Sequence, residues 1–80
     1  MYWNSPAVTI DQYKVKCSLL RAACPALDPH VLLFDTGWEL LGYSAETSEE
    51  PLVRIKHRSY ATAERDYKEA YRRLVAAGKL

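Results

Sequence analysis

The stretch from residue 52 to residue 58 constrains the fold of this chain more than any other, because apolar and basic side chains alternate along it. Successive side chains of a β-strand point to opposite faces of the sheet. A strand here separates the odd-numbered residues from the even-numbered ones: Val53, Ile55 and His57 against Arg54, Lys56 and Arg58. The run therefore predicts a strand at 52–58 whose first face lies on the core and whose second face carries cations.

Two apolar runs before this strand complete a sheet. Residues 30–34 and 38–43 flank Asp35-Thr36-Gly37, which is a pattern typical of two strands joined by a tight turn that contains glycine. The polar and acidic stretch 44–51 predicts a solvent loop before the third strand. Asp28-Pro29 is interpreted as a turn, or as the start of a short helix. Together these patterns predict a three-stranded antiparallel sheet.

Helical spacing precedes the sheet. Thr9 and Gln12 form a capping-box pattern, and Pro25 marks a stop, so we expect a helix near 9–23. Its apolar side is built from residues three or four apart: Ile10, Tyr13, Cys17, Leu20 and Cys24. Its wet side carries cations: Lys14, Lys16 and Arg21. Alternating residues 13, 15, 17 and 19 leave a strand as the alternative.

Helical spacing also follows the sheet. Ser59 or Thr62 is a suitable N-cap for a helix of about sixteen residues, and Gly78 ends it. One stripe of this helix is apolar: Ala63, Tyr67, Ala70, Tyr71 and Leu74. The fold class is therefore α+β: an N-terminal helix, a three-stranded antiparallel sheet, and a C-terminal helix packed on one sheet face. We expect one domain over 1–80, with 1–8 as an N-terminal arm.

The composition limits what such a domain does. The 11 basic and 10 acidic residues leave a net charge of +1, which gives no overall attraction to nucleic acid or to an anionic membrane. The N-terminus shows neither a charged nor an apolar leader region, and no stretch approaches the roughly 18 apolar residues of a membrane span. We expect a cytoplasmic protein without a membrane partner, in which Cys17 and Cys24 are free thiols.

Catalytic patterns are weak in this sequence. Asp35-Thr36-Gly37 resembles the active-site signature of aspartic proteases, which implies a dimer with one aspartate from each chain. However, Trp38 follows where that family has a small residue, and the triplet is also ordinary turn chemistry. No pair of cysteines or histidines has metal-ligand spacing, and no serine lies in a nucleophile elbow. We therefore expect that the protein is not an enzyme and that it binds neither a cofactor nor a metal.

Charged and aromatic side chains are the candidates for recognition. The three cations of strand 52–58 recur about every 6.7 Å, and such a row is able to follow a phosphate backbone. Glu39 is a possible cross-strand partner that neutralises them, and outer cations also discourage edge pairing. Aromatic residues suit interfaces. The candidate binding residues are Arg54, Lys56, Arg58, Tyr43, Tyr60, Trp38, Glu46, Glu49 and Glu50.

The closing segment adds a resemblance. The run RIKHRSYATAERDYKEAYRRL resembles the last strand and helix of short phage and prophage proteins, among them anti-CRISPR inhibitors. That resemblance implies a stoichiometric binder of a host complex, which acts in the cytoplasm of the host cell. We therefore predict a non-catalytic protein-binding module, an inhibitor of a host defence complex. The alternative is a nucleic-acid-binding domain that uses the basic face of strand 52–58, because the strand–helix order also resembles the arm-binding domains of phage integrases.

Overall fold

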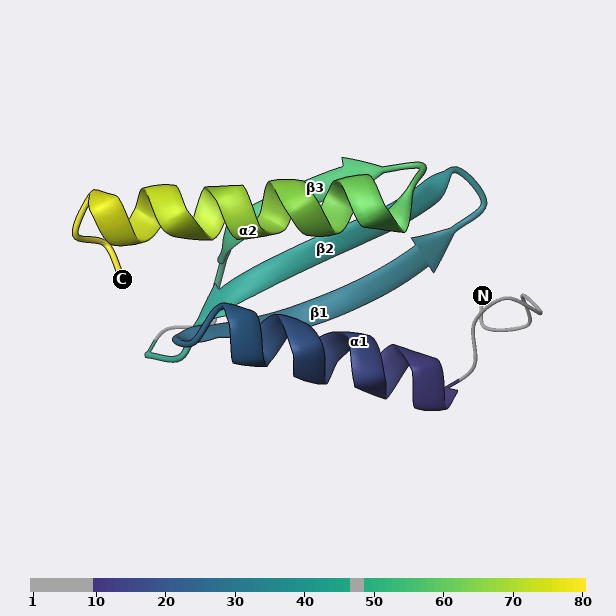
Figure 1. Cartoon of the computed structure of the whole chain (residues 1–80), viewed down its shortest axis with the longest axis horizontal. Helices are drawn as coiled ribbons and strands as arrows, with labels where there is room; N and C mark the ends of the chain where they lie inside the picture. Colours follow the sequence, from purple (N-terminus) through teal and green to yellow (C-terminus); the bar gives the residue numbers. More distant parts are fainter. Residues whose placement is uncertain (1–9, 47–48) are drawn as a thin grey trace.

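The computed structural model describes residues 10–46 and 49–80, with side chains from Gln12 onward. Along the chain the elements follow the order helix, three strands, helix (Figure 1). Their bounds are α1 Ile10–Ala23, β1 Leu27–Phe34, β2 Gly37–Ser44, β3 Pro51–His57 and α2 Tyr60–Ala76. The α+β class, the antiparallel sheet and the two helices are confirmed. The arm predicted at 1–8 and the cap predicted at Thr9 lie outside the described residues.

The sheet is an antiparallel meander in the order β1-β2-β3. A two-residue turn, Asp35-Thr36, joins β1 to β2. Gly37 follows with φ +137°, and a Cβ there would lie 2.6 Å from the carbonyl oxygen of His57. Only glycine fits this backbone conformation and this close approach. The Asp-Thr-Gly triplet therefore has a structural explanation as the β1–β2 turn.

The prediction for Asp28-Pro29 was wrong, because both residues lie inside β1. The chain turns earlier, at Pro25 and Ala26, where Ala26 has φ +81°. Proline lacks the N–H that a central strand needs, but β1 is an edge strand and so accommodates Pro29.

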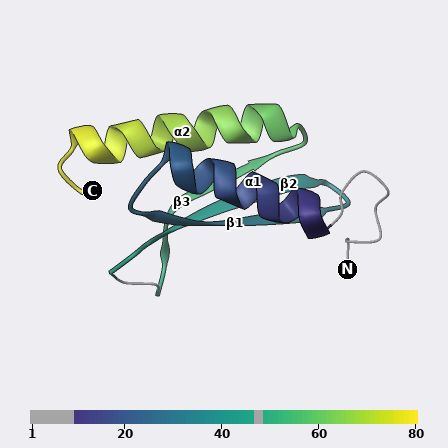
Figure 2. The same ribbon diagram turned by 60° about the horizontal axis from the view of Figure 1, so that its bottom comes forward.

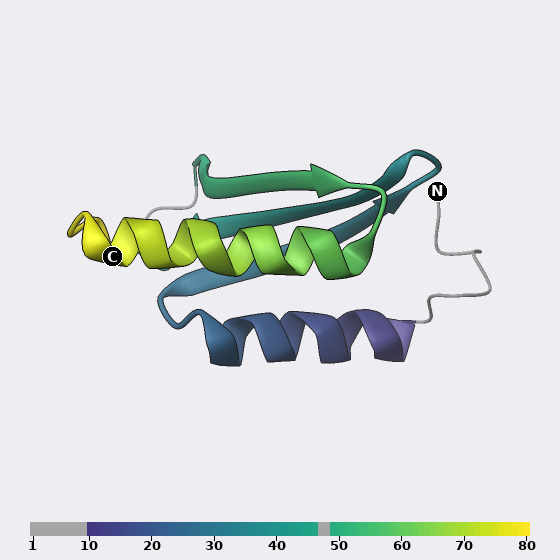
Figure 3. The same cartoon turned by 45° about the horizontal axis from the view of Figure 1, so that its top comes forward.

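Both helices pack on the same face of the sheet. α1 contacts β1, whereas α2 contacts β3 and β2 (Figure 3), and in Figure 2 the two helices lie on one side of the strands. One core cluster joins all five elements: Cys17, Leu20, Cys24, Leu27, Val31, Leu40, Val53, Ala63 and Tyr67. Both cysteines in it are free. The apolar stripe predicted for α1 is thus confirmed for its described members.

The exposure of one lysine on α1 differs from the prediction. Lys14 and Arg21 are exposed, as expected, but Lys16 is half-buried and its ammonium lies 4.0 Å from the ring centroid of Tyr60. The cation–π attraction explains why this lysine lies against the core rather than in solvent. In the described part of the chain, neither helix is long and apolar enough to cross a membrane.

α2 approaches the sheet closely at one glycine. A Cβ on Gly42 would lie 2.7 Å from the hydroxyl of Tyr67, which is fully buried. The helix begins after Ser59, whose side chain accepts a hydrogen bond from the N–H of Thr62 at 3.4 Å, and ends before Gly78, which has φ +75°. The predicted cap and the predicted stop are both confirmed.

Candidate protein-binding surface

The side of the sheet opposite the helices is covered by no described element, and we call it the open face. Strand register places its residues in rows across β1, β2 and β3. One row is His30, Leu41 and Arg54, and the next is Leu32, Glu39 and Lys56. A third row is Asp28, Tyr43 and Pro51, in which the Asp28 carboxylate lies 3.4 Å from His30. The described residues of the open face are Asp28, His30, Leu32, Phe34, Glu39, Leu41, Tyr43, Pro51, Leu52, Arg54 and Lys56.

The part of the open face on β1 and β2 is mainly apolar. Leu32, Phe34, Leu41 and Tyr43 are half-buried, and the Tyr43 ring meets the His30 ring edge-on at 5.0 Å. Leu52, at the start of β3, is 43% exposed. An antiparallel sheet commonly presents a polar outer face to solvent, whereas this part of the open face is an apolar area that no described element covers.

The part of the open face on β3 is basic. Arg54 and Lys56 are exposed, as is Arg58 just beyond the strand, and no described carboxylate lies within 4.0 Å of any of the three. Glu39 stands opposite Lys56 in the register yet forms no ion pair with it. The predicted alternation of β3 is confirmed, and none of the three cations forms an ion pair with a described carboxylate.

Two predicted aromatic residues lie elsewhere. Trp38 and Tyr60 pack edge-on at 5.1 Å on the covered side of the sheet, and Lys16 lies over both rings. The hydroxyl of Tyr60 is buried without a hydrogen-bond partner in the described structure, and burial raises the pKa of Tyr60 to about 12. The structure therefore places these two side chains apart from the open face, whereas Tyr43 lies on it.

The three predicted glutamates lie in the connection between β2 and β3. Glu46, Glu49 and Glu50 are exposed, and within the described ranges none of them forms an ion pair. The backbone N–H of Glu46 donates to the Ser44 hydroxyl at 3.1 Å. This acidic group lies at the end of the sheet where β3 begins, separate from the basic residues of β3.

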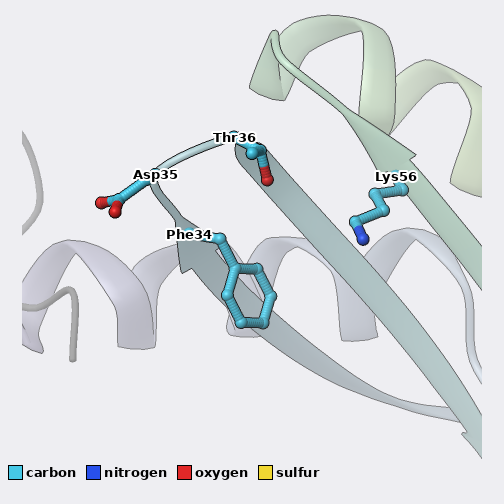
Figure 4. Close-up of a pocket in the computed structure, with 4 residues that line it drawn as sticks. All are labelled: Phe34, Asp35, Thr36 and Lys56. Carbon is cyan, nitrogen blue, oxygen red and sulfur yellow. The ribbon is translucent and has the colours of Figure 1, made fainter.

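Sequence reasoning missed two hollows beside β3. The hairpin hollow, about 280 Å³, is lined by Phe34, Asp35, Thr36 and Lys56 (Figure 4). The edge hollow, about 320 Å³, lies between β3 and α2 and is lined by Ile55, Asp66, Glu69, Ala70 and Arg73. The helical spacing of the last four of these residues was the available signal, because it places them on one stripe of α2 next to the core stripe.

The titratable groups where α2 meets the end of β3 are paired with one another. His57 Nε2 lies 2.8 Å from a carboxylate oxygen of Asp66, and this hydrogen bond lowers the pKa of Asp66. Arg72 and Arg73 pair with Glu69, whose pKa is lowered chiefly by the hydrogen bond from Arg72. No group of three potential metal ligands occurs among the described residues. What the arrangement offers is contact area and charge.

No known protein family, no curated protein and no solved structure matches this chain.

Proposed function

We propose that this protein is a small non-catalytic binding module that occupies a surface of another protein through its open face. The observation that carries the proposal is that apolar side chains of β1 and β2 lie beside exposed cations of β3 on a face that no described helix covers. An apolar centre with a charged rim is the usual anatomy of a protein interface. An inhibitor of a host complex, as the resemblance of the closing segment implies, would act in this way.

The test compares two leucines that are exposed on opposite sides of the molecule. Leu52 is 43% exposed on the open face, and Leu19 is 59% exposed on α1. A photo-activatable benzoylphenylalanine at position 52 should cross-link a defined protein in the source cells, whereas the same group at position 19 should not. The captured protein is then purified and titrated with the chain.

The matched substitutions Leu52→Lys and Leu19→Lys complete the test. Leu52→Lys should weaken the purified complex by roughly tenfold, about 1.4 kcal/mol, while Leu19→Lys leaves its affinity unchanged. Equal effects of the two substitutions, or cross-linking from position 19 alone, would exclude the open face as the binding surface.

A second candidate function is binding of nucleic acid. The specific observation in its favour is that Arg54 and Lys56 remain without described acidic partners beside the His30–Tyr43 ring pair. Cations that follow a strand bind phosphates, and exposed rings stack on bases. This function predicts affinity for single-stranded DNA or RNA that falls steeply above about 50 mM salt and drops in Arg54→Ala. Absence of binding at that salt concentration excludes it.

A further inference from the structure

β3 forms one edge of the sheet, because among the described strands it pairs with β2 alone. An edge strand presents backbone N–H and C=O groups that have no partner within the sheet. A strand from another molecule satisfies such groups by extending the sheet. The free side of β3 (Pro51–His57) is therefore the place to ask what a fourth strand would contact.

On the open face, a fourth strand would run beside the basic row. Arg54 and Lys56 are two residues apart, so they recur about every 6.7 Å, which is also the repeat of alternate side chains in a neighbouring strand. Each cation would thus face one side chain of the added strand. Because neither cation forms an ion pair with a described carboxylate, acidic side chains are the complementary choice.

On the covered face, a fourth strand would run above the edge hollow. Only β3 and α2 line this hollow, which places it on the outer side of β3 rather than toward β2. Ile55 and Ala70 supply its apolar surface. Its two carboxylates, Asp66 and Glu69, are paired with His57 and with arginines of α2. Charged side chains make up most of the lining, and an apolar side chain of moderate size would fit against Ile55 and Ala70.

The hairpin hollow extends the same pattern at the far end of β3. Figure 4 shows the Asp35 carboxylate directed away from Lys56, whose side chain lines the hollow. Glu39 stands opposite Lys56 in the register but forms no ion pair with it. Phe34 and Thr36 add an aromatic ring and a hydroxyl to the lining. A carboxylate on a short apolar stem matches this combination of groups.

The cations also decide which strand is accepted. A second copy of this chain, paired through its own β3, would bring two rows of arginine and lysine onto the same face, where like charges repel. A neutral apolar strand leaves the cations unpaired next to it, which is how edge strands resist unwanted pairing. An acidic strand is the occupant that the charges favour.

We propose that the free edge of β3 accepts a strand of a partner protein in which acidic and apolar residues alternate. The acidic residues pair with Arg54 and Lys56 on the open face, and the apolar residues enter the edge hollow on the other. This inference rests on the proposed function, since it specifies the partner and the contact of the same surface.

The test uses a blocked peptide as long as β3, with alternating glutamate and valine, added to the ¹⁵N-labelled full chain. The amide resonances of residues 52–57 should shift on titration, and those of β1 should not. A peptide with lysine in place of glutamate should show no binding. A third peptide, N-methylated at alternate backbone positions, keeps the charges but cannot pair as a strand, and it should bind at least tenfold more weakly.

Two variants with matched controls locate the contacts. Lys56→Glu should weaken binding of the glutamate–valine peptide by roughly tenfold, whereas Lys14→Glu on α1 should leave it unchanged. Ala70→Leu fills the edge hollow and should also weaken binding, whereas Ala61→Leu, at an exposed position of α2, should not. Each variant is first checked for an unchanged circular dichroism spectrum and melting temperature.

The result that overturns the proposal is equal binding of the lysine peptide or of the N-methylated peptide, amide shifts confined to other strands, or no shift at all. Displacement of the peptide by single-stranded DNA at equal affinity would assign the cations to nucleic acid instead. If cross-linking from position 52 captures a partner but the peptide leaves β3 unchanged, this inference fails and the proposed function stands. If the peptide binds β3 but no partner is captured through the open face, the proposed function fails instead.

Discussion

The contact between Gly42 and Tyr67 allows a sharp test of the packing between sheet and helix. A Cβ added to Gly42 would lie 2.7 Å from the Tyr67 hydroxyl and 3.1 Å from two of its ring carbons. The Tyr67 side chain is fully buried, so it can move away from an added Cβ only by displacing its neighbours in the core. Overpacking of this kind costs about 1–3 kcal/mol. We expect Gly42→Ala to lower the free energy of unfolding by about 2 kcal/mol, or about 10 °C in melting temperature.

Tyr67→Phe tests the cause of that loss. The Tyr67 hydroxyl is buried without a hydrogen-bond partner in the described structure, and burial raises its pKa. Removing a polar group buried without a partner is neutral or stabilising, by up to about 1 kcal/mol. In the double variant the 2.7 Å contact is gone while the ring contacts at 3.1 Å remain. About half of the loss should therefore be recovered, which is a coupling energy of about 1 kcal/mol.

Urea unfolding of the four proteins, followed by circular dichroism, measures this cycle. The slope of the unfolding free energy against urea should be the same in all four, so that the midpoints report stability alone. Additive effects within about 0.3 kcal/mol would refute the proposed contact. A loss of more than about 1 kcal/mol in Tyr67→Phe alone would show that the hydroxyl has a hydrogen-bond partner, such as a buried water.

Three further predictions concern the turns at Ala26 and Gly37 and the contact between Asp66 of α2 and His57 of β3. Ala26→Gly should stabilise the fold by about 0.5–1 kcal/mol, because Ala26 has φ +81°, whereas the control Ala76→Gly in α2 should cost up to about 1 kcal/mol in the same urea titration. Gly37→Ala should cost about 2 kcal/mol or more in urea unfolding, because its Cβ would meet backbone atoms of His57 and Arg58; a loss below about 0.5 kcal/mol would contradict that contact. Asp66→Asn should lower the melting temperature at pH 5 and have little effect at pH 2.5. The carboxyl pKa is lowered in the folded state, so its stabilisation is present above the ordinary value of 3.8 and is lost as the pH falls through the folded pKa; an equal effect at both values would contradict this assignment.

Local patterns predicted the elements of this fold because each pattern has a direct physical cause. Strict alternation over 52–58 determines which face of that strand lies on the core. The apolar stripe through Tyr67 likewise determines which side of α2 is buried. The prediction placed Pro29 in a turn, but proline destabilises a strand only where the strand needs the missing N–H. Whether a strand lies at the edge of the sheet depends on partners that are distant in sequence.

The residues that share the open face were predicted in part, because strand alternation is local whereas the packing of the helices is not. Arg54, Lys56 and Tyr43 lie on the open face, but Trp38 has the parity of the buried Leu40 and so faces the helices. The two hollows depend on how α2 and the β1–β2 turn lie beside β3, which no local pattern encodes. The open face itself follows only once both helices are known to share one side.

The position of the two cysteines has a practical consequence. Cys17 lies on α1 and is 8% exposed, and Cys24 lies in the connection from α1 to β1 and is 1% exposed. Burial raises the pKa of the Cys24 thiol. A water-soluble alkylating reagent reaches neither sulfur until α1 separates from the sheet. Alkylation of the two native thiols therefore measures that opening. The mass added to each intact molecule tells whether one thiol or both became accessible in the same event.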